Sequence, residues 1–539
     1  MNEFGKYRLF RKYVSLDGVE YTPLDEYQAL LVENNSCQCG YREIEYRFDG
    51  EYKNETLKKY EIWNEYSFCP TDSSYDELTG NVDYRNPTAA DGVILAKYVG
   101  NGKFSVTLCN TYFYEKIYIN NVEKGKKYKE YTFNNTKINE VAYTNVPNIL
   151  DGFFKHCDRL ISIIIPNTVT IIGDGTFINC ASLKSFNIPD SVTSIGYLAF
   201  SDCSDLTSVN IPNSVTSIGS GAFSRTPFDN NLPNGDIYLG SCYYKYKGEM
   251  PSNTSITIKD GTKGIAGGSF ENCSGLTSVT IPDSVTNIGD CAFQDCTSLT
   301  SITIPDSVTI IDDSAFYRCS GLTEIVIPDS VTYIGDYSFF DCSSLSSVSI
   351  GSGVTSIYQE TFTYCYSLTS ITIPDNVTSI GDYAFRSCGL KSVEIGNGVI
   401  SIGTSAFTNC YSLTSITIPD NVTSIGDSAF HKCSGLTSVT IGSGVKDIGE
   451  QSFYYCSGLT SVTIGSSVTT IGYQAFFGCK NLNSITCYAK KSPSFGHNSA
   501  FETETFNYLP TNGTLHVPNG SDYSRWLMEL PSGWTIEYI

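Results

Sequence analysis

Cysteine is the reactive residue type that stands out in this 539-residue sequence, which contains 20 of them. Thirteen follow one another at a step of 23 residues, apart from one step of 22 and one of 70. They are Cys157, Cys180, Cys203, Cys273, Cys296, Cys319, Cys342, Cys365, Cys388, Cys410, Cys433, Cys456 and Cys479. Disulfides between only some members of so regular a series would strain it. Because free cysteine is among the most buried residue types, we expect a ladder of buried, reduced thiols.

The other cysteines raise the question of a metal site. Cys291 and Cys487 fall outside the 23-residue spacing, and we expect both to be reduced. The candidates for a zinc site are Cys37, Cys39, Cys69 and Cys109. Zinc sites usually combine two closely spaced ligand pairs, but the Cys-x-Cys pair here is matched by no second such pair and no histidine pair. We therefore predict no metal and no cofactor.

Histidine could supply acid–base catalysis, but the four histidines are scattered along the chain. They are His156, His431, His497 and His516. The sequence also lacks the GxSxG, P-loop and HExxH motifs that would point to a nucleophile, a phosphate site or a zinc protease. The sequence therefore predicts no enzyme.

Aspartates recur at two positions of each 23-residue unit, counted from its cysteine as position 1. Those at position 11 are Asp283, Asp306, Asp329, Asp375 and Asp420, and those at position 18 are Asp290, Asp313, Asp336, Asp382 and Asp427. A catalytic pair would form one site, whereas these aspartates return in unit after unit. We interpret them as turn-capping residues, with calcium shared between neighbouring units as the alternative.

The unit that begins at Cys296, CTSLTSITIPDSVTIIDDSAFYRC, shows what the repeat should build. Leu299, Ile302 and Ile304 form the short strand pattern L-x-x-I-x-I, with the two isoleucines pointing inward. Pro305 then ends the strand, because proline cannot donate to the next ladder bond. Since no unit can bury its apolar face alone, neighbouring units must stack. We predict a mainly β solenoid with one short parallel strand in each 23-residue coil.

Threonine and serine occupy most of the outward positions of the expected strands. The candidate ligand-binding residues are Thr277, Ser278, Thr280, Thr300, Ser301, Thr303, Thr369, Ser370, Thr372, Thr414, Ser415 and Thr417. Dense hydroxyl groups would suit a protein or glycan ligand. Small β-branched and hydroxyl side chains also suit a crowded strand face, so a purely structural role stays open. Because the units are so uniform, we expect specificity where the template changes.

The pattern IPxSVTxIGxxAFxxC resembles the BspA-like (Treponema-type) leucine-rich repeat family over about residues 138–487. The resemblance implies a leucine-rich-repeat solenoid that serves adhesion or protein–protein recognition. We predict the solenoid over residues 136–487. An irregular insertion near 226–250 should bulge from the stack without interrupting it. A C-terminal cap is predicted over 488–539, where Trp526 and Trp534 would cover the last coil.

Residues 1–135 lack the repeat, and their short alternating patterns predict small all-β modules. We expect an anchor module over 1–88 and a β-hairpin module over 89–135. The stretch YRLFRKYVSLDGVEYTPLDEYQALLVENNSCQCGY resembles Tyr-rich N-terminal modules in tail and other virion-associated proteins of Bacteroidales-infecting (crAss-like) phages. Tyr21 stands where tryptophan is usual in that pattern. The resemblance implies attachment to other virion proteins.

Composition excludes several classes of partner. The formal net charge of −21 would repel phosphate backbones, so we expect no nucleic-acid binding. The first thirty residues contain no apolar core of a secretory signal, and none is expected. No stretch approaches 18 consecutive apolar residues, so no membrane insertion is expected.

These observations lead to a non-enzymatic binding or adhesion protein. The leading hypothesis is a phage virion tail or appendage protein, made in the host cytoplasm, whose solenoid recognises a host-surface protein or glycan. One alternative is a BspA-like adhesin on the bacterial cell surface. Another is a purely structural virion component whose solenoid packs against other virion chains.

Overall fold

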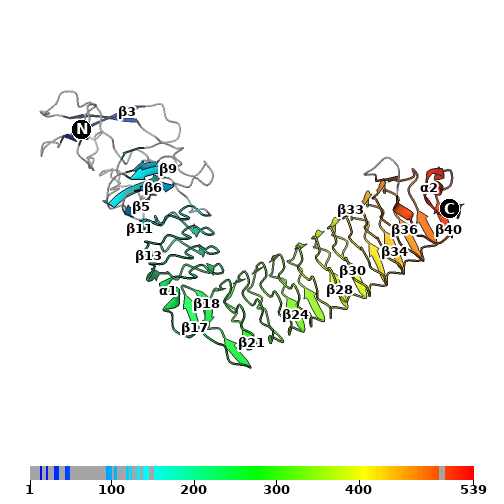
Figure 1. Cartoon of the computed structure of the whole chain (residues 1–539), viewed down its shortest axis with the longest axis horizontal. Helices are drawn as coiled ribbons and strands as arrows, with labels where there is room; N and C mark the ends of the chain where they lie inside the picture. Colours follow the sequence, from blue (N-terminus) through cyan, green and yellow to red (C-terminus); the bar gives the residue numbers. More distant parts are fainter. Residues whose placement is uncertain are drawn as a thin grey trace. The chain divides into compact units, whose positions relative to one another are not determined.

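A computed structural model describes residues 151–496 and 504–539, together with strands between Tyr13 and Thr144 (Figure 1). The chain forms two compact units, Met1–Leu232 and Pro233–Ile539. The cysteines proposed and rejected as zinc ligands, Cys37, Cys39, Cys69 and Cys109, lie outside the described residues, as does His497. In the described part of the chain, no helix has the length and apolar character that crossing a membrane requires.

The first unit begins with short strands, as the sequence predicts for its N-terminal part. They are β1 (Tyr13–Val14), β2 (Glu20–Tyr21), β3 (Ala29–Asn34), β4 (Glu43–Phe48), β5 (Val93–Val99), β6 (Gly102–Ser105), β7 (Ile117–Ile119), β8 (Val122–Glu123), β9 (Glu130–Phe133) and β10 (Ile138–Thr144). Strand β11 (Leu160–Ile164), in the first coil, pairs antiparallel with β5. One sheet, in the order β11-β5-β10-β7-β8, therefore joins residues from both sides of the predicted boundary at residue 135. The domain boundaries themselves stay a prediction.

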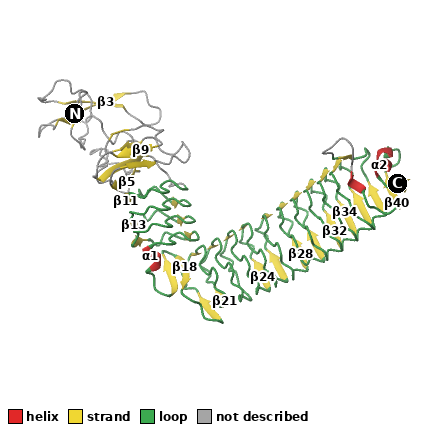
Figure 2. Cartoon of the chain, in the orientation of Figure 1, coloured by secondary structure: helices red, strands yellow, loops and turns green. Residues whose placement is uncertain are grey.

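Most solenoid coils of both units contain a longer and a shorter strand, joined by turns with little helix (Figure 2). In the first unit they are β11, β12 (Ile171–Ile172), β13 (Ser185–Asn187), β14 (Ser194–Ile195), β15 (Ser208–Asn210) and β16 (Ser217–Ile218), followed by α1 (Pro227–Asn230). The second unit opens with the hairpin of β17 (Gly235–Leu239) and β18 (Cys242–Lys247). The irregular insertion predicted near 226–250 thus spans the boundary between the two units, and its effect on the stack stays a prediction.

The second unit continues with two rows of strands. The longer strands are β19 (Thr254–Thr257), β21 (Leu276–Thr280), β24 (Glu324–Ile327), β26 (Ser347–Ile350), β28 (Ser370–Ile373), β30 (Ser392–Ile395), β32 (Ser415–Ile418), β34 (Ser438–Ile441), β36 (Ser461–Ile464) and β38 (Ser484–Cys487). The shorter strands are β20 (Gly264–Ile265), β22 (Asn287–Ile288), β23 (Ile310–Ile311), β25 (Tyr333–Ile334), β27 (Ser356–Ile357), β29 (Ser379–Ile380), β31 (Ser401–Ile402), β33 (Ser424–Ile425), β35 (Asp447–Ile448), β37 (Thr470–Ile471) and β39 (Ser494–Phe495). Paired strands of neighbouring coils run parallel, with Ser370 opposite Ser392 for example. The predicted parallel-strand solenoid is confirmed.

The coil that begins at Cys296 departs from its prediction in one respect. Ile302 and Ile304 point inward and are 8% and 5% exposed, as the alternating pattern requires. The longer of the two strands is missing between Leu299 and Ile304, however, because this coil makes no regular ladder of hydrogen bonds with its neighbours there. The strand prediction for this coil is wrong, although the burial prediction holds.

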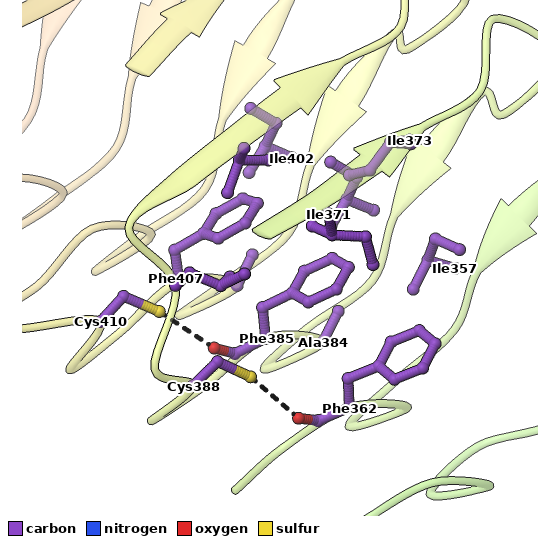
Figure 3. Close-up of a cluster of buried hydrophobic side chains, with 14 of the residues drawn as sticks. Ile357, Phe362, Ile371, Ile373, Ala384, Phe385, Cys388, Ile402, Phe407 and Cys410 are labelled. Atoms are coloured by element: carbon purple, nitrogen blue, oxygen red, sulfur yellow. Dashed lines mark hydrogen bonds between the residues drawn. The ribbon is translucent and has the colours of Figure 1, made fainter. Parts of the chain in front are cut away.

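Phenylalanine and cysteine recur in the interior of the coils, beside isoleucine, as Figure 3 shows for residues Ile357 to Cys410. Phe385 is fully buried, and its ring stacks between Phe362 at 5.4 Å and Phe407 at 5.2 Å. The thiol of Cys388 donates to the Phe362 carbonyl at 3.0 Å, and Cys410 repeats this bond to Phe385 at 3.1 Å. The position-1 cysteines are free and buried, so the predicted thiol ladder is confirmed, with a hydrogen bond to the preceding coil as an added function.

The turn that precedes each cysteine links coils through alternate backbone N–H groups. Tyr383, Phe385 and Ser387 donate to the next coil over 2.9, 2.8 and 2.8 Å. Tyr383 and Ser387 have φ angles of 57° and 56°, a left-handed backbone conformation that residues other than glycine rarely adopt. The bonds to the next coil therefore hold a backbone conformation that an isolated unit would not favour.

The region predicted as a C-terminal cap ends the second unit. It contains a 3-10 turn, η3 (Glu504–Phe506), the strands β40 (Asn512–Val517) and β41 (Gly533–Tyr538), and α2 (Ser524–Glu529). Strand β40 extends the sheet from β38. Trp526 is fully buried against Phe495 and Phe506, and its indole N–H donates to the Pro493 carbonyl at 3.1 Å. Trp534 is 5% exposed and belongs to the same core.

Candidate ligand-binding faces

The outward strand face of the second unit carries all twelve predicted binding residues. Ten of them are exposed, and Thr277 and Ser278 are half-buried. The inward residues between them are buried, such as Ile371 at 4% and Ile416 at 3% exposed. Alternation along the strand places Ser370 and Thr372 on one face, and Thr369 comes directly before the strand and is also exposed. The twelve residues are not gathered into one site, because they are distributed over coils along the unit.

Hydrogen bonds divide these hydroxyl groups into two kinds. The hydroxyl groups of Thr277 and Thr414 donate to the carbonyls of Thr254 and Lys391 at 3.0 and 3.1 Å, so they link neighbouring coils. Ser278 bonds to Ser255, and Thr372 donates to the Glu394 carboxylate at 3.0 Å. The side chains without a hydrogen-bond partner in the described chain are Thr280, Thr300, Ser301, Thr303, Thr369, Ser370, Ser415 and Thr417. This second group is available to a ligand.

A groove opens on the strand face between β26 and β28, which belong to different sheets. Its volume is about 390 Å³, and it is lined by Ser346, Ser347, Val348, Ser349, Ile350, Ser370, Ile371, Thr372 and Pro374. Val348 and Ile350 are half-buried here, whereas their counterparts in the next coil, Ile371 and Ile373, are buried. The groove therefore exposes apolar surface between rows of hydroxyl groups.

The residues around the groove include departures from the template that the prediction did not name as site residues. Glu324 and Val326 stand at outward positions of β24, and Glu394 stands at an outward position of β30. Val326 is 64% exposed, which is unusual for a valine in a folded chain. The sequence carries a signal for all three, because serine or threonine occupies these positions in most other coils.

The recurring aspartates accept backbone N–H groups from the following coil. At position 11, the acceptors are Asp329, Asp375 and Asp420, each at 2.7 Å. At position 18, they are Asp313, Asp336, Asp382 and Asp427, at 2.7–2.9 Å. For these seven residues the capping hypothesis is confirmed, although each bond crosses between coils. Backbone N–H donation from Ser352 and Ser443 lowers the pKa of Asp329 and Asp420.

The described residues contain no group of three or more metal-ligating side chains, so the calcium alternative gains no support from the geometry. The three described histidines lie in different surroundings. His156 bonds to Asn179 at 3.1 Å, His431 stacks on Tyr454, and His516 lies 3.4 Å from the Glu537 carboxylate. Burial, with a smaller contribution from Lys432, lowers the pKa of His431. The three described histidines therefore form no shared acid–base site.

Comparison with known proteins identifies the repeat. A family model described as a BspA type leucine-rich repeat region, in six copies, matches residues 126–246, 242–369 and 355–483. No curated protein matches the chain.

The chain is also similar to solved structures of bacterial leucine-rich repeat proteins. One from Bacteroides ovatus is 26% identical, with 66% of this chain and 92% of that chain covered and a TM-score of 0.35. A leucine-rich cell surface protein from Faecalibacterium prausnitzii is 30% identical, with 64% and 84% covered and a TM-score of 0.29. The leucine-rich repeat protein of Treponema pallidum is 26% identical, with 40% and 85% covered and a TM-score of 0.29.

Proposed function

Because the chain belongs to the BspA-type leucine-rich repeat family, we propose that it is a non-enzymatic binding or adhesion protein whose strand face contacts the ligand. The groove between β26 and β28 is the centre of that contact. Its ligand is a protein or glycan on a cell surface. The recurring interior and the absence of a shared acid–base site among the described residues both favour binding over catalysis.

The observation that carries this proposal is the combination of an apolar floor and unused hydrogen-bonding groups in the groove. Val348 and Ile350 offer apolar area, while the Ser370 hydroxyl lacks a partner within the described chain. Binding sites commonly combine apolar area with a few polar groups that fix orientation. A uniform structural surface would need neither the opening between the strands nor the exposed Val326.

The test is the affinity of the full chain for immobilised cell-surface glycans and extracellular matrix proteins, measured by biolayer interferometry. In the double variant S370R/T372R, two bulky cations fill one wall of the groove, and we expect at least tenfold weaker binding to any ligand found. The matched control S438R/T440R places the same charges on β34, outside the groove, and should bind as the unaltered chain does. Equal losses in both variants, or no loss in S370R/T372R, would contradict the groove as the contact.

The cellular location of the protein has two candidates. Members of the BspA-type family are typically surface-associated, which favours a bacterial cell-surface adhesin. The virion hypothesis rests on the N-terminal resemblance, whose residues lie before the first residue of the family match and are described only in the strands β1, β2 and β3. Antibody against the full chain should label intact bacterial cells if it is a surface adhesin, and purified phage particles if it is a tail or appendage protein.

A further inference from the structure

A cluster of tyrosines surrounds one arginine on the turn edge of the second unit, beside the N-terminal ends of β28 and β30. The guanidinium carbon of Arg386 lies 5.6 Å from the ring centre of Tyr364 and 5.5 Å from that of Tyr383. Tyr366 joins the group through Tyr364, with ring centres 5.8 Å apart. We call Tyr364, Tyr366, Tyr383 and Arg386 the tyrosine–arginine cluster.

Unlike Arg225 and Arg318, Arg386 has no carboxylate partner among the described residues, a feature that it shares with Arg159. Arg225 lies 2.7 Å from Asp202, and Arg318 lies 3.9 Å from Asp341. The Nε atom of Arg386 is buried and has no hydrogen-bond partner. A buried N–H group without a partner costs free energy, and guanidinium groups bind carboxylates and sulfates through strong charge-assisted hydrogen bonds. The rings of Tyr364 and Tyr383 therefore contact a guanidinium group that has no carboxylate partner in the described chain.

Tyr366 of the cluster has an exposed counterpart, Tyr411, two coils further along the chain. Tyr366 and Tyr411 occupy the same position of their coils, and each is 57% exposed. Both make the same local turn, because their N–H groups bond to the carbonyl two residues earlier at 2.9 Å. Adjacent coils are separated by 5.4 and 5.2 Å along the phenylalanine ladder here, so the two tyrosines are roughly 10 Å apart.

The coil between these tyrosines is the one that is a residue shorter than the template, and it places Gly389 between them. A Cβ atom at Gly389 would lie 2.1 Å from the Tyr366 carbonyl oxygen, so no side chain fits there. The shortened turn therefore lies against the backbone of Tyr366 and leaves the surface between the two tyrosine side chains without a side chain of its own. An open surface beside an exposed ring and an unpaired cation can receive a flat ligand.

We propose that Tyr366, Tyr411 and Arg386 bind an anionic sugar residue, bearing a carboxylate or a sulfate group, within an otherwise neutral glycan. The face of the sugar ring stacks on Tyr366, and its anionic group pairs with the Arg386 guanidinium. The roughly 10 Å between the tyrosines lets a following sugar of the same glycan reach Tyr411. This site lies outside the groove between β26 and β28 and is independent of the function proposed above.

Three considerations favour a sugar over an acidic peptide. The side chains beside the cluster include Ser387, whose hydroxyl lies 3.5 Å from the Asn409 amide, and such groups suit sugar hydroxyls. A net charge of −21 would repel an acidic polypeptide more strongly than a glycan with one anionic residue. A standard protein interface also needs about 800 Å² from each partner, much more than two exposed rings and one guanidinium provide.

The experiment is saturation-transfer NMR on the full chain with single sugars. The probes are glucuronic acid, N-acetylneuraminic acid and galactose 6-sulfate, with glucose and galactose as neutral controls. We expect at least one anionic sugar to bind at millimolar concentration, at least tenfold more tightly than the neutral sugars. If glucuronic acid or N-acetylneuraminic acid binds more tightly than galactose 6-sulfate, the preferred anion is a carboxylate. The reverse order of affinities identifies a sulfate.

Variants identify the residues responsible. R386Q should remove the preference for anionic sugars, and Y366A should weaken all sugar binding at least fivefold, with unfolding midpoints checked for both. The matched control R318Q changes an arginine that lies 5.2 Å from the Tyr317 ring but already pairs with Asp341, and it should bind as the unaltered chain does. The proposal is overturned if no anionic sugar binds, or if R386Q and Y366A both bind as the unaltered chain does.

Discussion

The middle coils of the second unit, residues 319–409, and its C-terminal coils, residues 410–496, share an interior but differ on the outside. The ring separation is 5.4 Å between Phe362 and Phe385 in the middle coils and 5.2 Å between Phe430 and Phe453 in the C-terminal coils. The longer strands differ, because β24–β26 and β28–β30 pair only in twos while β32, β34, β36 and β38 form one sheet with the cap.

The outward residues follow the same division. The middle coils hold Glu324, Val326 and Glu394 at strand positions where the C-terminal coils keep serine and threonine. They also contain the groove, the shortened turn at Gly389 and the tyrosine–arginine cluster. Outward positions can therefore change while the interior ladder stays the same, because each coil is held to its neighbours through inward residues and backbone bonds.

The largest expected effect would come from breaking the interior, and it should be the same in both regions. Phe385→Ala in the middle coils and Phe430→Ala in the C-terminal coils each remove a fully buried ring stacked on two others. We expect each to lower the free energy of unfolding by about 3–5 kcal/mol, measured by urea denaturation. A difference of more than about 2 kcal/mol between the two would show that the interiors are not equivalent.

A smaller effect is expected from the thiol ladder. Cys388→Ala and Cys433→Ala each remove a donor to a phenylalanine carbonyl, at 3.0 and 3.1 Å respectively. The loss of this bond and of a small buried group should cost about 1–2 kcal/mol in either region. Urea midpoints of the two variants test this value, with Cys→Ser at the same positions as the control that keeps a donor. An unchanged midpoint in both alanine variants would contradict a stabilising function for the thiols.

The smallest effect concerns pH. Asp329 in the middle coils and Asp420 in the C-terminal coils both have a pKa lowered by a backbone N–H from the following coil. A carboxylate whose pKa is lower in the folded state stabilises the fold above its unfolded pKa of about 3.9, and this contribution is lost as pH falls through the folded pKa.

The double variant D329N/D420N should therefore lose less stability than the unaltered chain when pH is lowered from about 5 to about 2. Urea midpoints across this range measure the difference. An identical pH dependence in the variant would show that these two exposed carboxylates contribute nothing measurable to the pH dependence of stability.

Most of the fold could be predicted from the repeat, because its information is local. The alternation of Leu299, Ile302 and Ile304 predicts which side chains point inward, and the structure buries all three. The absence of a hydrogen-bonded strand from Leu299 to Ile304 could not be predicted, since ladder bonds depend on the exact separation from both neighbouring coils. The sequence predicted that Asp329 and Asp420 cap turns. It could not predict that the N–H groups they accept belong to the following coil, because that contact depends on how the coils stack.

The candidate site was less predictable than the fold. The sequence placed Ser370 and Thr372 on the outward face, but the groove beside them depends on β26 and β28 belonging to different sheets. Arg386 gave no sequence signal, because nothing in its local pattern shows that it lies between two tyrosine rings without a carboxylate partner.

The sequence by itself determined the coil, a 23-residue unit with isoleucine, phenylalanine and cysteine facing inward. Such a unit can bury its apolar side chains only by stacking on its neighbours. Only the tertiary structure decided which outward residues meet, where the strand face opens and which polar groups are left without partners. The physical reason is that burial within a coil follows from side-chain periodicity along the chain, whereas these features depend on distances between atoms of different coils.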